Sequence, residues 1–210
     1  MGWFPPLTFQ AAPSEEMKKE IVKKGYGFAL RPVREADAEF ILHLRTMPHV
    51  HGNVGDTVPD VAGQLRWLKA YFLREGDHYF IIETMAGVPV GTVGVYDLKD
   101  GTAEWGRWII VPGVPAAIPS AVLIHQLAFD NLGLRELRGC VVSTNKKVLS
   151  FHRRFGSVVT SIEKGARRIN GCDIDLVWIL MDKPRWRERS PKLCTLAEFS
   201  GASQKSQVLI

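Results

Sequence analysis

The alternation of apolar and polar positions divides this chain into short strands and amphipathic helices. Period-two patterns predict seven strands, at residues 27–33, 78–84, 88–97, 102–111, 136–143, 158–162 and 172–181. Apolar residues at helical spacing predict four helices, at residues 34–44, 60–74, 116–132 and 145–155. Asp60 is a candidate N-cap, and Gly133 and Gly156 end the last two helices. Periodicity alone therefore predicts a mixed α+β domain.

The two ends of the chain differ in composition from its centre. Residues 1–26 are expected to be an N-terminal arm, in which the charged stretch 15–24 has the spacing of a short helix. Residues 27–184 are expected to form the folded domain, with a long Pro- and Gly-containing loop at 46–60. Residues 185–210 are expected to be a tail, loose from residue 192 onward because that part is rich in Ser and Lys.

Composition narrows the class of protein. The chain has 210 residues, 46% of them hydrophobic, which is enough for one domain with a core. The net charge of +5 suits an anionic ligand but is too small to indicate nucleic acid. The chain contains neither an apolar run of about 18 residues nor a signal-peptide pattern, so we expect no membrane span. Cys140, Cys172 and Cys194 give neither a disulfide framework nor metal-ligand spacing, so we expect a reducing, cytoplasmic compartment.

The stretch 102–156 carries most of the candidate chemistry. A strand that runs into a Gly/Pro loop and then a helix directs several backbone N–H groups at one point, which suits a pyrophosphate. Pro112 and Pro115 each remove one donor from this loop. The remaining backbone donors are those of Gly113, Val114, Ala116, Ala117 and Ile118. The loop is therefore either a phosphate site poor in donors or a tight connector that binds nothing.

Three polar positions around this stretch are candidates for catalysis. Glu104 is either a base for an amine or the partner of a nearby cation such as Arg107. Asn145 is a good N-cap for the second helix. His152 lies seven residues later, and because imidazole titrates near pH 6.5 it can supply or accept a proton near neutrality, unless it is simply structural or exposed.

Other residues are candidates for holding the second substrate. Trp105 and Arg107 alternate along the strand 102–111, so one of them is expected to face an acceptor cleft. Arg107 has the right chemistry for a phosphate or carboxylate, although surface pairing explains it equally well. His49 and His51 lie in the loop 46–60 as candidate acceptor contacts. No further ligands accompany these two histidines, so no metal site is predicted.

The order of elements resembles that of the GCN5-related N-acetyltransferase (GNAT) family over residues 28–183. The resemblance is carried by LRPVREADAE (30–39), AEWGRW (103–108), AFDNLGL (128–134) and the pattern N-x-x-V-L-S-F-H-x-x-F-G that begins at Asn145. It is strongest to the RimJ/RimL-like branch, which includes nucleotide-sugar N-acetyltransferases of surface-polysaccharide pathways. The resemblance implies a mostly antiparallel, twisted central sheet of about seven strands flanked by about four helices.

The resemblance also implies roles for particular residues. Acetyl-CoA would be the co-substrate, with its pantetheine arm along the backbone of Ile109, Ile110 and Val111 and near Asn145. Its pyrophosphate would lie on the loop donors named above. His152 occupies the place of the family's tyrosine acid, and Glu104 lies where relatives carry acidic residues. The family pattern Gln/Arg-x-x-Gly-x-Gly/Ala falls on residues 112–117, where only Ala117 fits.

The predicted activity is an acyl-CoA-dependent N-acyltransferase. The acceptor amine would attack the thioester directly, while a backbone N–H such as that of Ile110 polarises the carbonyl. The resemblance suggests an amino group of a nucleotide-linked sugar as the acceptor, and a protein N-terminus or a small amine is the alternative. A binding protein without catalysis and an enzyme that uses a carrier-protein thioester are two further alternatives. The oligomeric state is open between a monomer and a homodimer.

Overall fold

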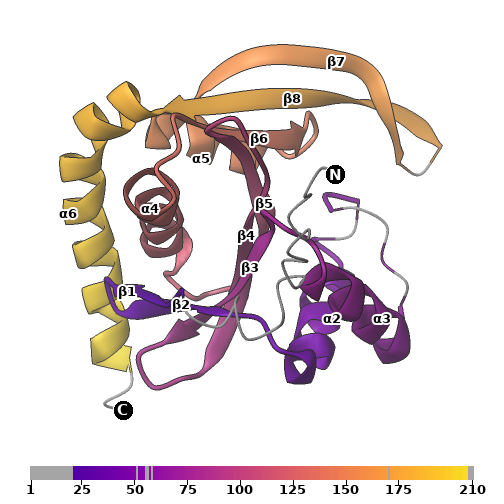
Figure 1. The fold of residues 1–210 in the computed structure, drawn as a ribbon, viewed down its shortest axis with the longest axis horizontal. Coiled ribbons are helices and arrows are strands. Elements are labelled where there is room, and N and C mark those ends of the chain that lie inside the picture. Colours follow the sequence, from indigo (N-terminus) through magenta and orange to yellow (C-terminus); the bar gives the residue numbers. More distant parts are fainter. Residues whose placement is uncertain (1–20, 51, 55–56, 58, 170, 208–210) are drawn as a thin grey trace, which may run out of the picture.

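One open sheet of eight strands runs through the part of the chain that the structure describes. The structure is a computed structural model, and it describes residues 21–207 except 51, 55, 56, 58 and 170 (Figure 1). The spatial order of the strands is β1-β2-β3-β4-β5-β6-β8-β7. Their bounds are β1 (Lys23–Gly25), β2 (Phe28–Pro32), β3 (His78–Thr84), β4 (Pro89–Lys99), β5 (Thr102–Ile110), β6 (Glu136–Val142), β7 (Val158–Ile169) and β8 (Cys172–Asp182).

Helices cover both faces of this sheet (Figure 1). Helices α2 (Ala38–Thr46) and α3 (Val61–Phe72) pack on one face through a small core of their own. Helices α4 (Ala117–Gln126) and α6 (Lys183–Gln207) lie on the opposite face, where the largest core cluster joins them to the central strands. The short helix α5 (Lys146–Phe155) follows β6. This arrangement confirms the predicted α+β fold, with one strand and one helix more than expected.

The pairing of β5 with β6 sets the position of the site. All other neighbouring strands are antiparallel, whereas β5 and β6 are parallel and pair over only three positions, from Thr102 opposite Glu136 to Glu104 opposite Arg138. Beyond these positions β5 stays with β4, and β6 stays with β8. The two strands therefore diverge, and an opening is left between residues 105–110 and 139–142.

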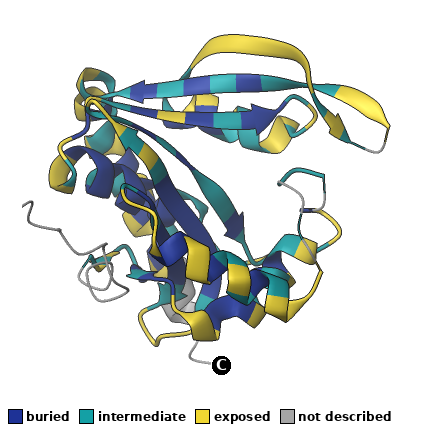
Figure 2. Cartoon of the chain, turned by 45° about the vertical axis from the view of Figure 1, so that its right-hand side comes forward, coloured by how far each residue is buried: buried dark blue, intermediate teal, exposed yellow. Residues whose placement is uncertain are grey.

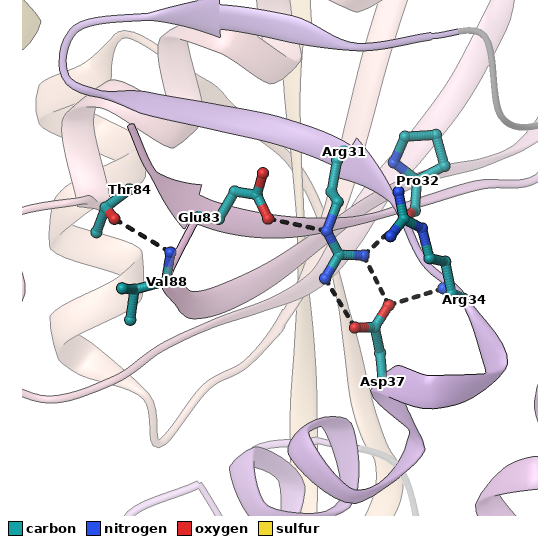
Figure 3. Close-up of polar contacts among 7 residues, drawn as sticks. All are labelled: Arg31, Pro32, Arg34, Asp37, Glu83, Thr84 and Val88. Atoms are coloured by element: carbon teal, nitrogen blue, oxygen red, sulfur yellow. Dashed lines mark hydrogen bonds and ion pairs between the residues drawn. The ribbon is translucent and has the colours of Figure 1, made fainter. Parts of the chain in front are cut away.

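A part-buried ion-pair cluster fixes the start of the domain. Arg31 of β2 donates to both carboxylate oxygens of Asp37 at 2.8 Å, and its Nε donates to Glu83 of β3 at 2.8 Å (Figure 3). Asp37 ends the 3-10 turn η1 (Glu35–Asp37) and also accepts from the backbone N–H of Arg34. At the far end of β3, the hydroxyl of Thr84 accepts from the N–H of Val88 in the hairpin turn. Because the Arg31 cluster joins β2, β3 and the entry to α2, it holds the helical layer against the sheet.

The C-terminal segment corrects one expectation. Residues 185–210 were expected to be a tail, loose from residue 192, but helix α6 extends to Gln207 and packs along α4. Trp186, Leu193 and Ala197 are at most 5% exposed. Gly201 lies so close to the β1–β2 turn that a Cβ atom there would meet the carbonyl oxygen of Tyr26 at 2.0 Å. Tertiary packing therefore outweighs Pro191, Gly201 and the serines of this segment, which disfavour a helix.

Smaller differences affect the element bounds. The helix predicted over 116–132 is α4 followed by a π-helical turn, η2 (Leu127–Asn131). Strand β7 runs to Ile169, seven residues beyond its predicted end, and is largely exposed (Figure 2). The short helix predicted over 15–24 falls mostly outside the described residues, but its last two residues belong to strand β1. No helix in the described part is both long and apolar enough to cross a membrane.

Candidate active site

A cleft of about 1220 Å³ opens where β5 and β6 diverge. Its walls come from β5, β6, the start of α5, the loop 47–60 and the β7–β8 hairpin. Of the residues expected to form the site, the cleft brings together Glu104, Trp105, Arg107, Ile109, Asn145, His152 and His49. His51 lies outside the described residues, so its expected contact with the acceptor stays a prediction. Ile110, Val111 and the loop 112–117 do not line this cleft.

A β-bulge in β5 decides which side chains face which helices. Gly94 of β4 lies opposite Gly106, and Thr92 lies opposite Ile109, so two residues of β5 face one of β4. Arg107 adopts φ +51°, and its carbonyl accepts from the Thr92 hydroxyl at 2.7 Å. The bulge breaks the simple alternation that the sequence pattern predicts. As a result, Arg107 reaches Trp67 of α3, and Trp108 donates to Ser120 of α4 at 3.0 Å.

Arg107 is neutralised by a buried carboxylate. Its two terminal nitrogens donate to the two oxygens of Asp77 at 2.5 and 2.9 Å. The guanidinium also lies over the rings of Trp67, Tyr79 and Tyr96, at 4.3 to 5.3 Å from their centroids. A guanidinium already paired with a carboxylate in this way has little net charge left to bind a substrate anion. Pairing with Asp77 therefore explains the presence of Arg107 on this strand, and substrate binding is not needed. The pair is buried, whereas the alternative raised from the sequence was a pair on the surface.

Glu104 is held by a cross-strand partner. Tyr96 of β4 lies opposite it, and the Tyr96 hydroxyl donates to the Glu104 carboxylate at 2.8 Å. Burial raises the pKa of Glu104 above its ordinary value, and the hydrogen bond from Tyr96 only partly offsets this effect. Glu104 therefore combines a fixed position, access to the cleft and a pKa moved toward neutrality, which suits a general base. The ion pair with Arg107, which was the alternative role for Glu104, does not form, because Arg107 binds Asp77.

Trp105 and two histidines form an aromatic cluster on the other face of β5. The Trp105 ring meets His125 and His152 edge-on, with centroids 5.0 and 5.1 Å away. All three side chains are buried. Trp105 touches the cleft, but its side chain belongs to the large core cluster. The sequence left His125 as a structural residue, and its place inside the core is consistent with that interpretation.

The burial of His152 changes its expected chemistry. Burial lowers its pKa to about 4, so at neutral pH nearly every molecule carries the uncharged ring. An imidazole of ordinary pKa would supply a proton near neutrality, but this one is too rarely protonated to do so efficiently. Its Nδ1 is buried and has no hydrogen-bond partner among the described residues. The neutral ring can still donate one hydrogen bond or accept one at the wall of the cleft.

The expected phosphate loop retains part of its donor set. Gly113 takes φ +85°, a conformation that glycine adopts without strain. The N–H of Val114, one of the expected donors, instead bonds to the Val111 carbonyl at 3.3 Å within the loop. Ala116 is the N-cap of α4 and provides no side-chain cap, so the first N–H groups of α4 have no partner within the helix. The loop therefore can receive an anion, mainly at Ala117 and Ile118.

Asn145 caps α5 as the sequence predicts. Its Oδ1 accepts from the N–H of Val148 at 3.2 Å. Asn145 also lines the cleft, so the expected pantetheine contact and the cap are compatible. The next two residues, Lys146 and Lys147, line the cleft and also a second cavity of about 620 Å³. This second cavity lies between α5, α6 and the first turn of α4.

Several residues that line the cleft were not identified from sequence. Arg45 of α2 donates to the Thr57 hydroxyl at 2.9 Å, and burial lowers its pKa, with further lowering by Arg107 and Arg167. Arg167 of β7 donates to the Val54 carbonyl, which joins the hairpin to the loop 47–60. The Trp178 indole N–H is buried, lines the cleft and has no partner among the described residues. These contacts join segments far apart in sequence, so no local pattern signals them.

Comparison with solved structures finds the same architecture. FdhC, described as a nucleotide-linked sugar GNAT, is 28% identical with a TM-score of 0.70, over 85% of this chain and 98% of that chain. A GCN5-related N-acetyltransferase from Brucella melitensis matches at 19% identity and TM-score 0.73, over 84% and 85%. A chimera of spermidine N-acetyltransferase SpeG from Vibrio cholerae matches at 18% identity and TM-score 0.70, over 78% and 99%. Comparison with curated protein sequences gives no match.

A family model provides the remaining comparison. The model of the acetyltransferase (GNAT) domain matches residues 28–158, more than half of the chain. The matched region begins at β2 and ends at the start of β7, so it contains the diverging strands, the loop before α4 and α5. The fold, the diverging strands and this match lead to one conclusion: the chain belongs to the GNAT acetyltransferase family.

Proposed function

We propose that this protein transfers an acetyl group from acetyl-CoA to an amino group of a nucleotide-linked sugar. Membership of the GNAT family supports N-acetyltransferase activity. The observation that carries the proposal is the cleft between β5 and β6, which is lined by a half-buried carboxylate and by several cationic side chains. The donor and the acceptor would meet in this cleft, so that the amine attacks the thioester without a covalent enzyme intermediate.

The donor would enter between the diverging strands. Beyond Glu104 the β6-facing edge of β5 has no strand partner among the described residues. The N–H of Val111 bonds to the Val90 carbonyl of β4, so by alternation the backbone groups of Ile110 point to the open edge and are available to an extended pantetheine arm. A backbone N–H on this edge, for which Ile110 is the candidate, would polarise the thioester carbonyl. The free N–H groups at the start of α4 would receive the pyrophosphate.

The charge of the cleft favours an anionic acceptor over a polyamine. Among the described lining residues, Arg45, Arg167, Lys146 and Lys147 carry positive charge, and Arg107 is already paired. Glu104 is the one carboxylate among the same lining residues. Such a surface would repel a polycation such as spermidine and would attract the diphosphate of a nucleotide-linked sugar. The similarity to FdhC, whose description names a nucleotide-linked sugar, points the same way.

Glu104 is the proposed general base. The attacking amine must lose a proton, and the raised pKa of Glu104 brings that carboxylate closer to the ideal for proton removal near neutrality. Tyr96 holds the carboxylate in place through its hydroxyl. His152 would act as a neutral hydrogen-bonding group beside the leaving thiol rather than as an imidazolium acid.

A thiol-release assay tests this proposal. Purified protein and acetyl-CoA are incubated with UDP- or dTDP-linked amino sugars in one series and with spermidine in another. We expect thiol release with at least one sugar nucleotide and none above background with spermidine. Turnover of spermidine with no response to any sugar nucleotide would overturn the acceptor class.

One observation favours a different acyl donor. Pro112 and Pro115 remove two backbone N–H donors from the loop, and the N–H of Val114 is already bonded to a carbonyl within the loop. An acyl group on a carrier protein needs the pantetheine groove but no pyrophosphate site. Transfer from an acetylated carrier protein, combined with no response to acetyl-CoA, would favour this second candidate.

A further inference from the structure

The second cavity has a wall that the matched family region does not supply. It is lined by Ile118 of α4, by the α5 residues Lys146, Lys147, Ser150, Phe151, Arg154 and Phe155, and by Leu193 and Leu196 of α6. We propose that α6 is part of the donor site, with Leu193 and Leu196 as the apolar wall against which the adenine base of the donor lies. This inference rests on the proposed function, because it takes acetyl-CoA as the donor.

The chemistry of the cavity is divided between two helices. The α5 side presents Lys147, Arg154 and the N-terminal Lys146, which suit phosphate groups. The α6 side presents two leucines, and the Phe151 ring adds apolar surface between the helices. A flat base next to several phosphates needs this combination, whereas a purely cationic surface would serve phosphate alone. The volume of about 620 Å³ lies in the usual range for small-molecule sites.

The position of the cavity suits the distal end of a long ligand. Lys146 and Lys147 line both this cavity and the acceptor cleft, so the two spaces meet at the start of α5. Ile118 belongs to the first turn of α4, where the proposed pyrophosphate donors lie. A donor with its thioester in the cleft would pass this turn and place its nucleotide between α5 and α6.

The α6 wall is held firmly in place. Trp186 and Ala197 are buried in the main core, and Ser200 donates to the Pro115 carbonyl of the loop at 2.9 Å. Helix α6 therefore contacts both the second cavity and the loop before α4. Leu196 itself is 41% exposed, which is high for a leucine on a helix docked so closely. Since Leu196 lines a cavity rather than filling the core, a ligand in that cavity would cover it.

A charge placed at Leu196 tests the inference. Leu196→Glu puts a carboxylate where the base and phosphates would lie, and because the residue is partly exposed the fold should tolerate it. Calorimetry with acetyl-CoA and with adenosine 3′,5′-bisphosphate should show affinities about tenfold weaker than wild type, as expected for loss of one apolar contact and added repulsion. Leu196→Met should keep near-wild-type affinity, and Leu196→Ala should fall between the two.

A matched control separates this effect from a general one. Leu73→Glu makes the same change at a leucine that is 70% exposed just after α3 and lines neither cavity. It should leave both affinities unchanged, and thermal melting should show that all variants are folded. If Leu196→Glu binds both ligands as tightly as wild type, the inference is overturned and the proposed function stands. If wild-type protein binds neither ligand but accepts an acyl group from a carrier protein, both are overturned.

Discussion

The two faces of β5 differ in charge: one carries charged side chains and the other carries uncharged rings. Toward α3, Arg107 and Glu104 are charged groups held by Asp77 and Tyr96. Toward α4, Trp105 lies between two histidines that burial keeps uncharged. The bulge at Arg107 shifts the alternation by one residue, so that Arg107 shares Tyr96 with Glu104 while Trp108 contacts Trp105. The face toward α3 therefore holds paired charges and presents Glu104 to the cleft as a base. The face toward α4 forms a rigid, uncharged wall of the cleft.

The comparison indicates where changes should matter for stability and where for turnover. On the charged face, removing one member of a pair leaves a buried charge without compensation. On the neutral face, the sensitive variable is pH, because the buried rings are stable only while they are uncharged.

Asp77→Ala should destabilise the fold most. It leaves the Arg107 guanidinium buried without its bidentate partner, a loss that typically costs about 3–5 kcal/mol. Urea unfolding measures the change in the free energy of unfolding. Glu75→Ala, an exposed carboxylate two residues away, should change it by less than about 0.5 kcal/mol. Equal, small losses in both variants would contradict the claim that the charged face depends on this pair.

Glu104→Gln should lower turnover while the protein stays folded. The amide keeps the shape of the side chain and can still accept from the Tyr96 hydroxyl, but it cannot take a proton from the amine. We expect kcat to fall about 100-fold or more, which corresponds to about 2.7 kcal/mol in the barrier, with unchanged binding of acetyl-CoA. A kcat within a factor of two of wild type would remove Glu104 from the proton transfer.

His125→Phe should make the free energy of unfolding less dependent on pH. Burial lowers the pKa of His125 to about 3, so the unfolded chain binds a proton near pH 6.5 that the folded chain does not. Stability is therefore retained above about pH 6.5 and lost as the pH falls toward the folded-state value. Between pH 7 and pH 5 the loss from this residue should be about 2 kcal/mol.

The measurement is urea unfolding at pH 7 and pH 5 for wild type and variant. Phenylalanine cannot titrate and still fits a site lined by Phe129, Phe155 and Trp186. It also removes Nε2, a buried nitrogen without a partner among the described residues. His152, with its pKa lowered to about 4, should leave a similar but separate pH dependence in the variant. An identical slope in both proteins would show that His125 is not buried in the neutral form.

Arg167→Ala should have the smallest effect, confined to the acceptor. Arg167 lies at the cleft and joins the β7–β8 hairpin to the loop 47–60. Its loss should raise the KM for an anionic acceptor by about three- to tenfold, roughly 1 kcal/mol, and leave acetyl-CoA affinity unchanged. Arg168→Ala is the matched control, since the neighbouring residue is exposed and does not line the cleft. Equal KM values for the two variants would argue against an anionic acceptor.

Local patterns predicted the elements well because periodicity is a local property. Strand β3 has the predicted bounds, and the helix that starts after Asn145 is capped by that residue as expected. Helix α6 was missed because Pro191, Gly201 and several serines interrupt it, although its buried residues Trp186, Leu193 and Ala197 follow helical spacing. Contacts with α4, β8 and the β1–β2 turn stabilise this helix, and they join segments far apart in the sequence.

Three residues proposed for the site lie in one cleft, their roles stay predictions, and their electrostatics could not be predicted from the sequence. Glu104, Asn145 and His152 line one cleft, as the motif spacing suggested. The bulge at Arg107, the Asp77 partner and the Tyr96 contact depend on strand register and on segments up to 30 residues apart. The lowered pKa of His152 follows from burial among aromatic rings, which sequence alone does not fix. The sequence therefore proposes the candidate groups, and their burial in the structure determines the direction in which their pKa values move.

Calorimetric titration of the wild-type protein with acetyl-CoA tests the central claim, that the opening between β5 and β6 is a donor site. We predict a saturable signal with one molecule bound per chain and a Kd in the range typical of enzyme substrates, about 1 μM to 1 mM. The same titration with pantetheine should give weaker binding, because the pyrophosphate and nucleotide contacts are missing. Absence of any binding at millimolar acetyl-CoA would contradict a donor site between β5 and β6.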